Sequence, residues 1–113
     1  MNTSFPDRDF QLWEYKVSHG CLLIRSPEGP EIAKNVDLIC VGVDYLAAPG
    51  YIRGIELVEG TAEEITTLSH LLGKDIQPTN LRVIVSEGRR FPIVAVGFKF
   101  SENEDDIFHS PFL

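Results

Sequence analysis

The feature that most constrains the fold is a series of short runs rich in β-branched and aromatic residues, each bounded by turn residues. Runs of this length predict β-strands, and only one segment, 62–72, has apolar residues at helical spacing. The links at 19–20 and 88–90 are so short that the strands they join must pair antiparallel. The sequence therefore predicts an α+β fold, with a mostly antiparallel, curled sheet of about six strands and one helix. The predicted strands are 10–18, 21–26, 37–46, 51–59, 81–87 and 91–100.

The first predicted strand has the alternating pattern of a half-buried strand. Trp13, Tyr15 and Val17 would lie on its apolar face, and the polar residues between them would face solvent. His19-Gly20 follows where a two-residue hairpin turn is expected, because glycine adopts positive φ at little cost.

The predicted helix 62–72 carries both start and stop signals. Thr61 and Glu64 match a capping box, and Gly73 suits the left-handed position that often follows a helix. We expect a buried stripe that comprises Ala62, Ile65, Leu68 and either Leu71 or Leu72.

One amphipathic helix can cover only part of one face of a six-stranded sheet. The remaining apolar surface must curl on itself into a roll or half-barrel, or be covered by another chain, so a homodimer is one solution. The 113 residues fit one domain. We expect this domain to span residues 1–100, where the sheet ends, and to be followed by an acidic and then apolar tail, 101–113.

The charge balance excludes two classes of partner. Seventeen acidic and ten basic residues give a net charge of −7 and a pI of about 4.8, which argues against nucleic acid and against an anionic membrane. The apolar runs are far shorter than the ~20 residues of a membrane span, and the N-terminus lacks a signal-peptide pattern. We therefore expect a cytoplasmic protein.

Motifs for metals, cofactors and catalysis are missing from the sequence. It contains no C-x-x-C, H-x-H, H-E-x-x-H or G-x-S-x-G pattern and no glycine-rich phosphate loop, so we expect no metal, no cofactor and no catalytic residue of a known pattern. Cys21 and Cys40 are expected to be free core thiols. Arg89 and Arg90, at a hairpin tip, are expected to be solvated, the alternative being that they hold an anion.

Asp44 is the most unusual polar residue because it interrupts the apolar run 37–46. It either marks a solvated strand end or is a buried binding-site carboxylate, which would need a donor such as Arg53 or Arg82. The candidate ligand-binding set is Asp44, Tyr45, Trp13, Tyr15 and Arg53.

The C-terminal segment is acidic over residues 101–106 and apolar afterwards. Ile107, Phe108 and Phe112 are candidate partner-binding residues, because they would forgo burial if the tail stayed in water. They are expected to dock onto their own domain or a second copy, or to bind another protein, whereas Glu102 to Asp106 should stay solvated.

Small size, acidic charge and aromatic strands favour a non-enzymatic protein that acts through protein–protein interaction. In composition alone it resembles small acidic proteins that neutralise a basic partner, such as toxin-immunity proteins. A small-ligand-binding α+β domain and a small enzyme with an unrecognised site are the alternatives.

Overall fold

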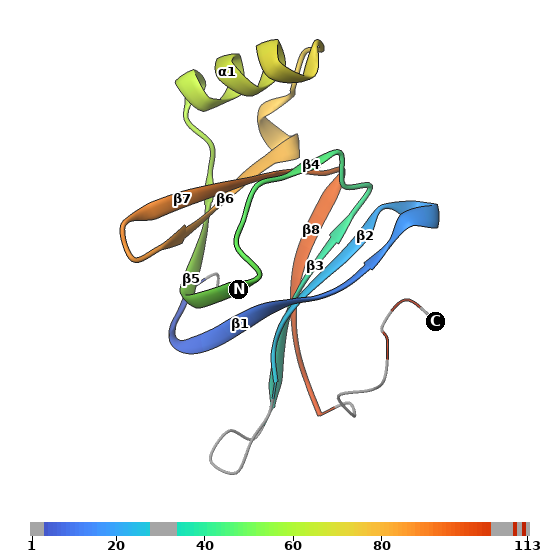
Figure 1. Ribbon diagram of the computed structural model, residues 1–113, viewed down its shortest axis with the longest axis vertical. Helices are drawn as coiled ribbons and strands as arrows, with labels where there is room; N and C mark the ends of the chain where they lie inside the picture. Colours follow the sequence, from blue (N-terminus) through green and yellow to red (C-terminus); the bar gives the residue numbers. More distant parts are fainter. Residues whose placement is uncertain (1–3, 28–33, 105–109, 111, 113) are drawn as a thin grey trace.

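The computed structural model describes residues 4–27, 34–104, 110 and 112. These residues form one antiparallel sheet with a single α-helix, so the α+β class is confirmed, but the sheet has eight strands and not about six (Figure 1). The strands are β1 (Ser4–Lys16), β2 (Cys21–Ser26), β3 (Asn35–Val41), β4 (Tyr45–Leu46), β5 (Tyr51–Glu59), β6 (Leu81–Ser86), β7 (Arg89–Val94) and β8 (Gly97–Asn103). The helices are α1 (Ala62–Leu72) and two short 3₁₀ helices, η1 (Val17–His19) and η2 (Pro78–Asn80).

Two of the predicted strands are each divided in two by a sharp bend, which accounts for the higher number. The predicted strand 37–46 becomes β3 and β4, and the predicted strand 91–100 becomes β7 and β8. Gly42 has a φ of +63°, and a Cβ atom at that position would lie 2.7 Å from Cγ2 of Val96 in the other bend. The two bends therefore pack directly against each other, and the first of them requires glycine.

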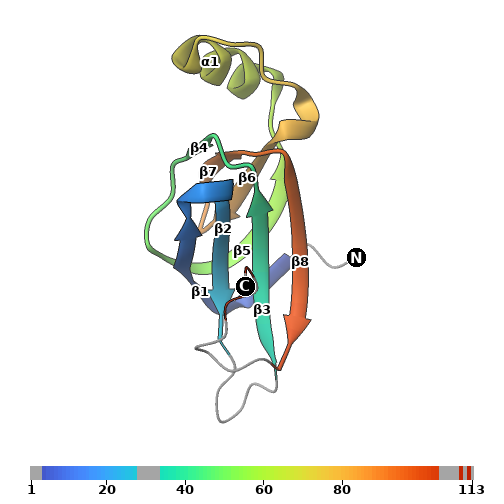
Figure 2. The same cartoon turned by 90° about the vertical axis from the view of Figure 1, so that its right-hand side faces the viewer.

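The sheet closes on itself because these two bent segments pair with each other twice. The strand order is β4-β7-β6-β5-β1-β2-β3-β8, so β3 pairs with β8 at one end of the order and β4 pairs with β7 at the other. Backbone hydrogen bonds from Val96 to Val41 (3.0 Å) and from Asp44 to Val94 (2.8 Å) continue the pairing across the bends. The result is a rolled, barrel-like sheet (Figure 2).

The interior of the roll is apolar, so the sheet covers most of its own inner face. Its buried residues are Phe5, Phe10, Leu22, Ile24, Val36, Leu38, Cys40, Ile52, Ile55, Ile84, Ile93 and Ala95. A second cluster, in which Leu68 of α1 packs with Ile76, Leu81, Val83 and Val94, anchors the helix to β6 and β7. The sheet therefore does not depend on a second chain to cover its core.

The first strand differs from its prediction at both ends. It begins at Ser4, and its pairing with β2 is interrupted by a register shift between Leu12 and Glu14. After this irregularity Tyr15 is 50% exposed, and Val17, which lies in η1, is 81% exposed. The predicted apolar face of Trp13, Tyr15 and Val17 is therefore wrong, because a β-bulge breaks the alternation on which it rests.

Helix α1 has the predicted bounds, with Thr61 and Glu64 forming the capping box and Gly73 in the left-handed conformation. Of its predicted stripe, Leu68 is the buried member, while Leu71 is 61% exposed. No helix within the described ranges is long and apolar enough to cross a membrane.

The hairpin between β6 and β7 is tied to the start of the helix. Glu64 accepts hydrogen bonds from Arg90 Nη2 (2.8 Å) and Nε (3.1 Å). This pairing, together with the cap, lowers the pKa of Glu64 from 4.5 to about 2. Arg90 therefore has an intramolecular carboxylate partner, whereas Arg89 is exposed as expected for a hairpin tip.

A buried ion pair lies on the face of β2 and β3 opposite the core. Arg25 donates from Nε and Nη2 to the two carboxylate oxygens of Asp37 at 2.7 and 2.9 Å, and the two side chains are 0% and 1% exposed. Asn103 donates to the same carboxylate at 2.9 Å. Because Asn103 belongs to β8, which pairs with β3 to its end, the expectation that the sheet ends at residue 100 is wrong. Glu102 pairs with Val36 in this ladder, but its side chain is exposed, as expected.

Candidate functional site

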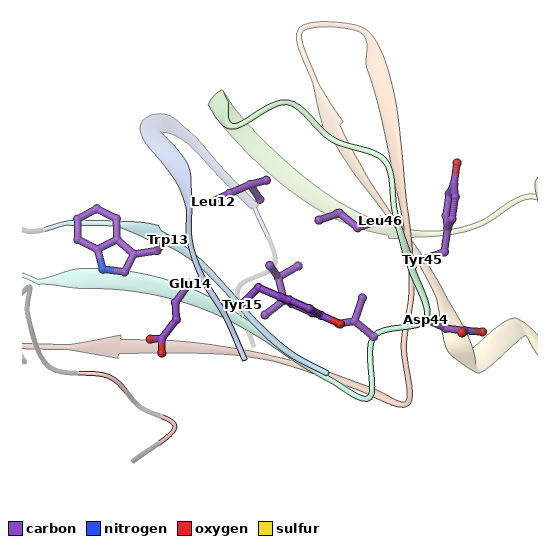
Figure 3. A pocket seen from close by; sticks show the side chains of 9 residues that line it. Leu12, Trp13, Glu14, Tyr15, Asp44, Tyr45 and Leu46 are labelled. Atoms are coloured by element: carbon purple, nitrogen blue, oxygen red, sulfur yellow. The ribbon is translucent and has the colours of Figure 1, made fainter. Parts of the chain in front are cut away.

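A hollow of about 470 Å³ lies where the sheet is not continuous, between the second half of β1 and the segment around β4 (Figure 3). Strand β1 pairs with β5 only as far as Gln11. Beyond that point, backbone hydrogen bonds from Leu12 to Gly50 and from Val43 to Gly20, both 2.9 Å, bridge the two segments at either end of the hollow. The lining residues are Leu12, Trp13, Glu14, Tyr15, Leu22, Val43, Asp44, Tyr45 and Leu46.

Four of the five residues in the predicted ligand-binding set line this one hollow: Asp44, Tyr45, Trp13 and Tyr15. They do not all point into it. In Figure 3, Tyr15 extends into the space between the two segments, whereas Trp13 lies to one side and the side chains of Asp44 and Tyr45 lie to the other. Of the predicted set, Tyr15 therefore enters the hollow, and the other three residues lie at its edges.

Trp13 is engaged by the protein itself. The guanidinium carbon of Arg25 lies 5.6 Å from the centroid of the indole ring, within the range of a cation–π interaction. Trp13 therefore covers the buried ion pair of Arg25 and Asp37 and, at the same time, forms one edge of the hollow.

Asp44 lies between β3 and β4, is 43% exposed, and pairs with Lys74 from the segment after α1. Neither Arg53 nor Arg82, the donors considered from the sequence, is its partner. The interpretation of Asp44 as a solvated residue at a strand end agrees with this position.

Arg53 lies away from the hollow and pairs with Asp9 across β1 and β5 at 2.8 Å. The hydrogen bond from Arg53 lowers the pKa of Asp9, and the hydrogen bond to Asp9 raises the pKa of Tyr51. The structure therefore separates Arg53 from the other four members of the predicted set.

A second hollow of about 520 Å³ adjoins the first and shares Tyr15, Val43 and Asp44 with it. Beside Tyr15, it is bordered by Val17 and Val96, which are 81% and 75% exposed. We call Tyr15, Val17 and Val96 the apolar patch.

Sequence reasoning missed this patch because it had placed Val17 and Val96 inside regular strands. Their exposure depends on η1 and on the bend between β7 and β8. No local pattern in the sequence signals either feature.

The border of the two hollows is acidic. Glu14, Asp44 and Asp75 contribute carboxylates, and Lys74 contributes the one lysine or arginine among the lining residues. Within the described ranges Lys74 is paired with Asp44, whereas Glu14 and Asp75 form no ion pair. The apolar patch is therefore surrounded by net negative charge.

Of the predicted partner-binding residues, Phe112 is described, and Ile107 and Phe108 lie outside the described residues. Phe112 is half-buried, its carbonyl oxygen accepts a hydrogen bond from Lys16 Nζ at 3.3 Å, and it borders a hollow of about 460 Å³ with Ile39 and Lys99. Phe112 thus contacts its own chain on the outer face of the sheet.

The two cysteines are free, and they face opposite ways on neighbouring strands. Cys40 pairs in register with Leu22, both belong to the core, and burial raises the pKa of the Cys40 thiol to about 12. Cys21 precedes Leu22 and so points away from this core. Among the described residues, no group of three histidine, cysteine or acidic side chains is arranged to hold a metal ion.

Comparisons with known protein families, with curated proteins and with solved structures found no match. The shape and charge of the two hollows are therefore the basis for a proposed function.

Proposed function

We propose that the protein acts by binding a basic protein partner, in the manner of an immunity protein, through the apolar patch and its acidic border. The observation that carries the proposal is the convergence of Tyr15 and Val17, where β1 runs into η1, with Val96 from the bend between β7 and β8; the three are exposed by 50%, 81% and 75%. An apolar centre with a polar margin is the usual anatomy of a protein interface.

Charge supports a basic partner in particular. The whole chain carries a net charge of −7, and the unpaired carboxylates of Glu14 and Asp75 lie at the border of the patch within the described part of the chain. Such a field accelerates association with a basic surface and disfavours an acidic one. A homodimer through the same patch would bring two like-charged borders together, so a basic partner is the better match.

A peptide-display selection tests this proposal and does not require the partner to be identified first. The protein is presented to a random library at moderate salt, and the selected peptides are sequenced. We expect them to be rich in lysine, arginine and apolar residues. Selected peptides that are neutral or acidic would contradict the proposal.

Two variants with the same charge change locate the binding. Val17→Lys removes an apolar contact and adds a repulsive charge at the patch, whereas Leu71→Lys makes the same change on α1, where Leu71 is 61% exposed. We expect Val17→Lys to abolish binding of the selected peptides and Leu71→Lys to retain it. Equal loss in both variants would show that the patch is not the contact surface.

A small-ligand site in the first hollow is a second candidate function. It is favoured by the position of Trp13, Tyr15, Asp44 and Tyr45 around a space of about 470 Å³, into which Tyr15 extends and which is within the range of ligand pockets. A thermal-shift screen against metabolites tests it. A stabilising compound that quenches the fluorescence of Trp13 would support this candidate over the first.

A further inference from the structure

The first hollow has an apolar floor and one carboxylate on each side, and this arrangement specifies more than a generally basic partner. Resting on the proposed function, we infer that the hollow receives one large apolar side chain of the partner, flanked on both sides by lysine or arginine residues. The apolar side chain would be the anchor of the interface, and the flanking cations would contact Glu14 and Asp44.

The floor selects the apolar anchor. In Figure 3 the side chains of Leu12 and Leu46 point toward each other from opposite segments, and Leu22 and Val43 also line the space. Because these residues come from the edge of the barrel core, an inserted aliphatic or aromatic side chain would extend that core. Anchors of this kind, seated in a preformed pocket, supply most of the binding energy of many interfaces.

The carboxylates on the two sides of the hollow favour flanking cations in the partner. Glu14 lies on the β1 side of the hollow and Asp44 on the side of β4, with the apolar floor between them (Figure 3). Glu14 forms no ion pair within the described ranges, so a cation on that side would supply its partner, and a cation on the other side would reach the exposed carboxylate of Asp44. A segment in which basic residues both precede and follow the apolar residue satisfies both.

Lys74 already pairs with Asp44, but this pair does not block the inference. The two side chains are 55% and 43% exposed, and exposed ion pairs contribute little to stability. A carboxylate also has room to accept from two donors. Asp44 can therefore turn from Lys74, or share its oxygens, when a cation of the partner arrives.

The direct test uses synthetic nine-residue peptides with a central leucine and a lysine on each side. Binding is measured by the fluorescence of Trp13, the one tryptophan of the chain, and by amide chemical shifts. We expect replacement of the leucine by serine to weaken binding about tenfold, and replacement of both lysines by glutamine to weaken it by a similar factor. No binding at millimolar peptide, or no effect of either replacement, would overturn the inference.

Charge-neutralising variants of the protein complete the test. Glu14→Gln and Asp44→Asn should each weaken binding of the lysine-flanked peptide about threefold and leave binding of the glutamine-flanked peptide unchanged. Glu56 is an exposed acid on β5, and Glu56→Gln should change the binding of neither peptide. If Glu56→Gln weakened binding equally, the peptide would be attracted by the net charge of the protein and not by these two carboxylates, and the inference would be overturned.

The two proposals can fail separately. If Val17→Lys abolished binding of the selected peptides, but Glu14→Gln and Asp44→Asn did not change it, the anchor with flanking cations would be contradicted. The proposed function would remain in place. If the selected peptides were also insensitive to Val17→Lys, both would be contradicted.

Discussion

Replacing Asp37 by alanine should be among the most destabilising single changes in the structure. The substitution leaves Arg25 charged and 0% exposed, after removing acceptors that it contacts at 2.7 and 2.9 Å. It also removes the acceptor of an Asn103 hydrogen bond of 2.9 Å. Breaking a buried ion pair on one side typically costs about 3–5 kcal/mol. For a domain of this length, total stability is roughly 6–17 kcal/mol, so the loss is a large fraction of it.

Urea unfolding followed by tryptophan fluorescence measures this cost. Circular dichroism is the second probe, because Trp13 contacts Arg25 and its fluorescence can change with the substitution itself. The matched control is Asp9→Ala, which removes an exposed ion pair with Arg53 and should change the midpoint little. The double variant Arg25→Met, Asp37→Leu should recover much of the lost stability, because no buried charge remains. An unfolding midpoint for Asp37→Ala equal to that of Asp9→Ala would show that the buried pair contributes no more to stability than the exposed one.

Three further substitutions test the helix, its anchor and the bend. Glu64→Gln should lower the free energy of unfolding by about 1 kcal/mol at neutral pH. Because the folded pKa of Glu64 is lowered from 4.5 to about 2, its contribution is present above pH 4.5 and is lost as the pH falls toward 2. The variant and wild type should therefore converge at pH 2 in urea titrations, with Glu63→Gln as the control. Leu68→Ala should cost about 2–5 kcal/mol, and an unchanged midpoint would show that α1 is not docked. Gly42→Ala should cost about 1–3 kcal/mol, whereas Gly50→Ala, which meets open space, should be near neutral in the same assay.

Elements specified by neighbouring residues were predictable from the sequence. The helix 62–72 has the predicted bounds because its capping box and Gly73 are local signals. The strands 21–26 and 51–59 also have the predicted bounds, since turn residues delimit both.

Features that depend on tertiary packing were not predictable. The bends at Gly42 and before Gly97 pack against each other where two segments that pair on both sides of the bends turn, and the continuous apolar runs there look like unbroken strands. The extension of β1 back to Ser4 runs through Pro6 and two aspartates, residues that ordinarily signal a loop.

In the candidate site, too, part of the prediction was correct and part depended on tertiary pairing. Trp13, Tyr15, Asp44 and Tyr45 were predicted as a set from residue type and strand position, and they line one hollow. Arg53 was assigned to that set by charge alone, and the pairing of β1 with β5 gives it Asp9 instead.

Hydrogen–deuterium exchange with and without a peptide from the display selection locates the bound surface without any substitution in the protein. Binding at the apolar patch should slow exchange in residues 12–20 and 41–46 and around Val96, which form the hollows and the patch. No change is expected in α1 or in the hairpin of β6 and β7. Protection confined to α1 or to β8, with none in residues 12–20, would contradict binding at the apolar patch.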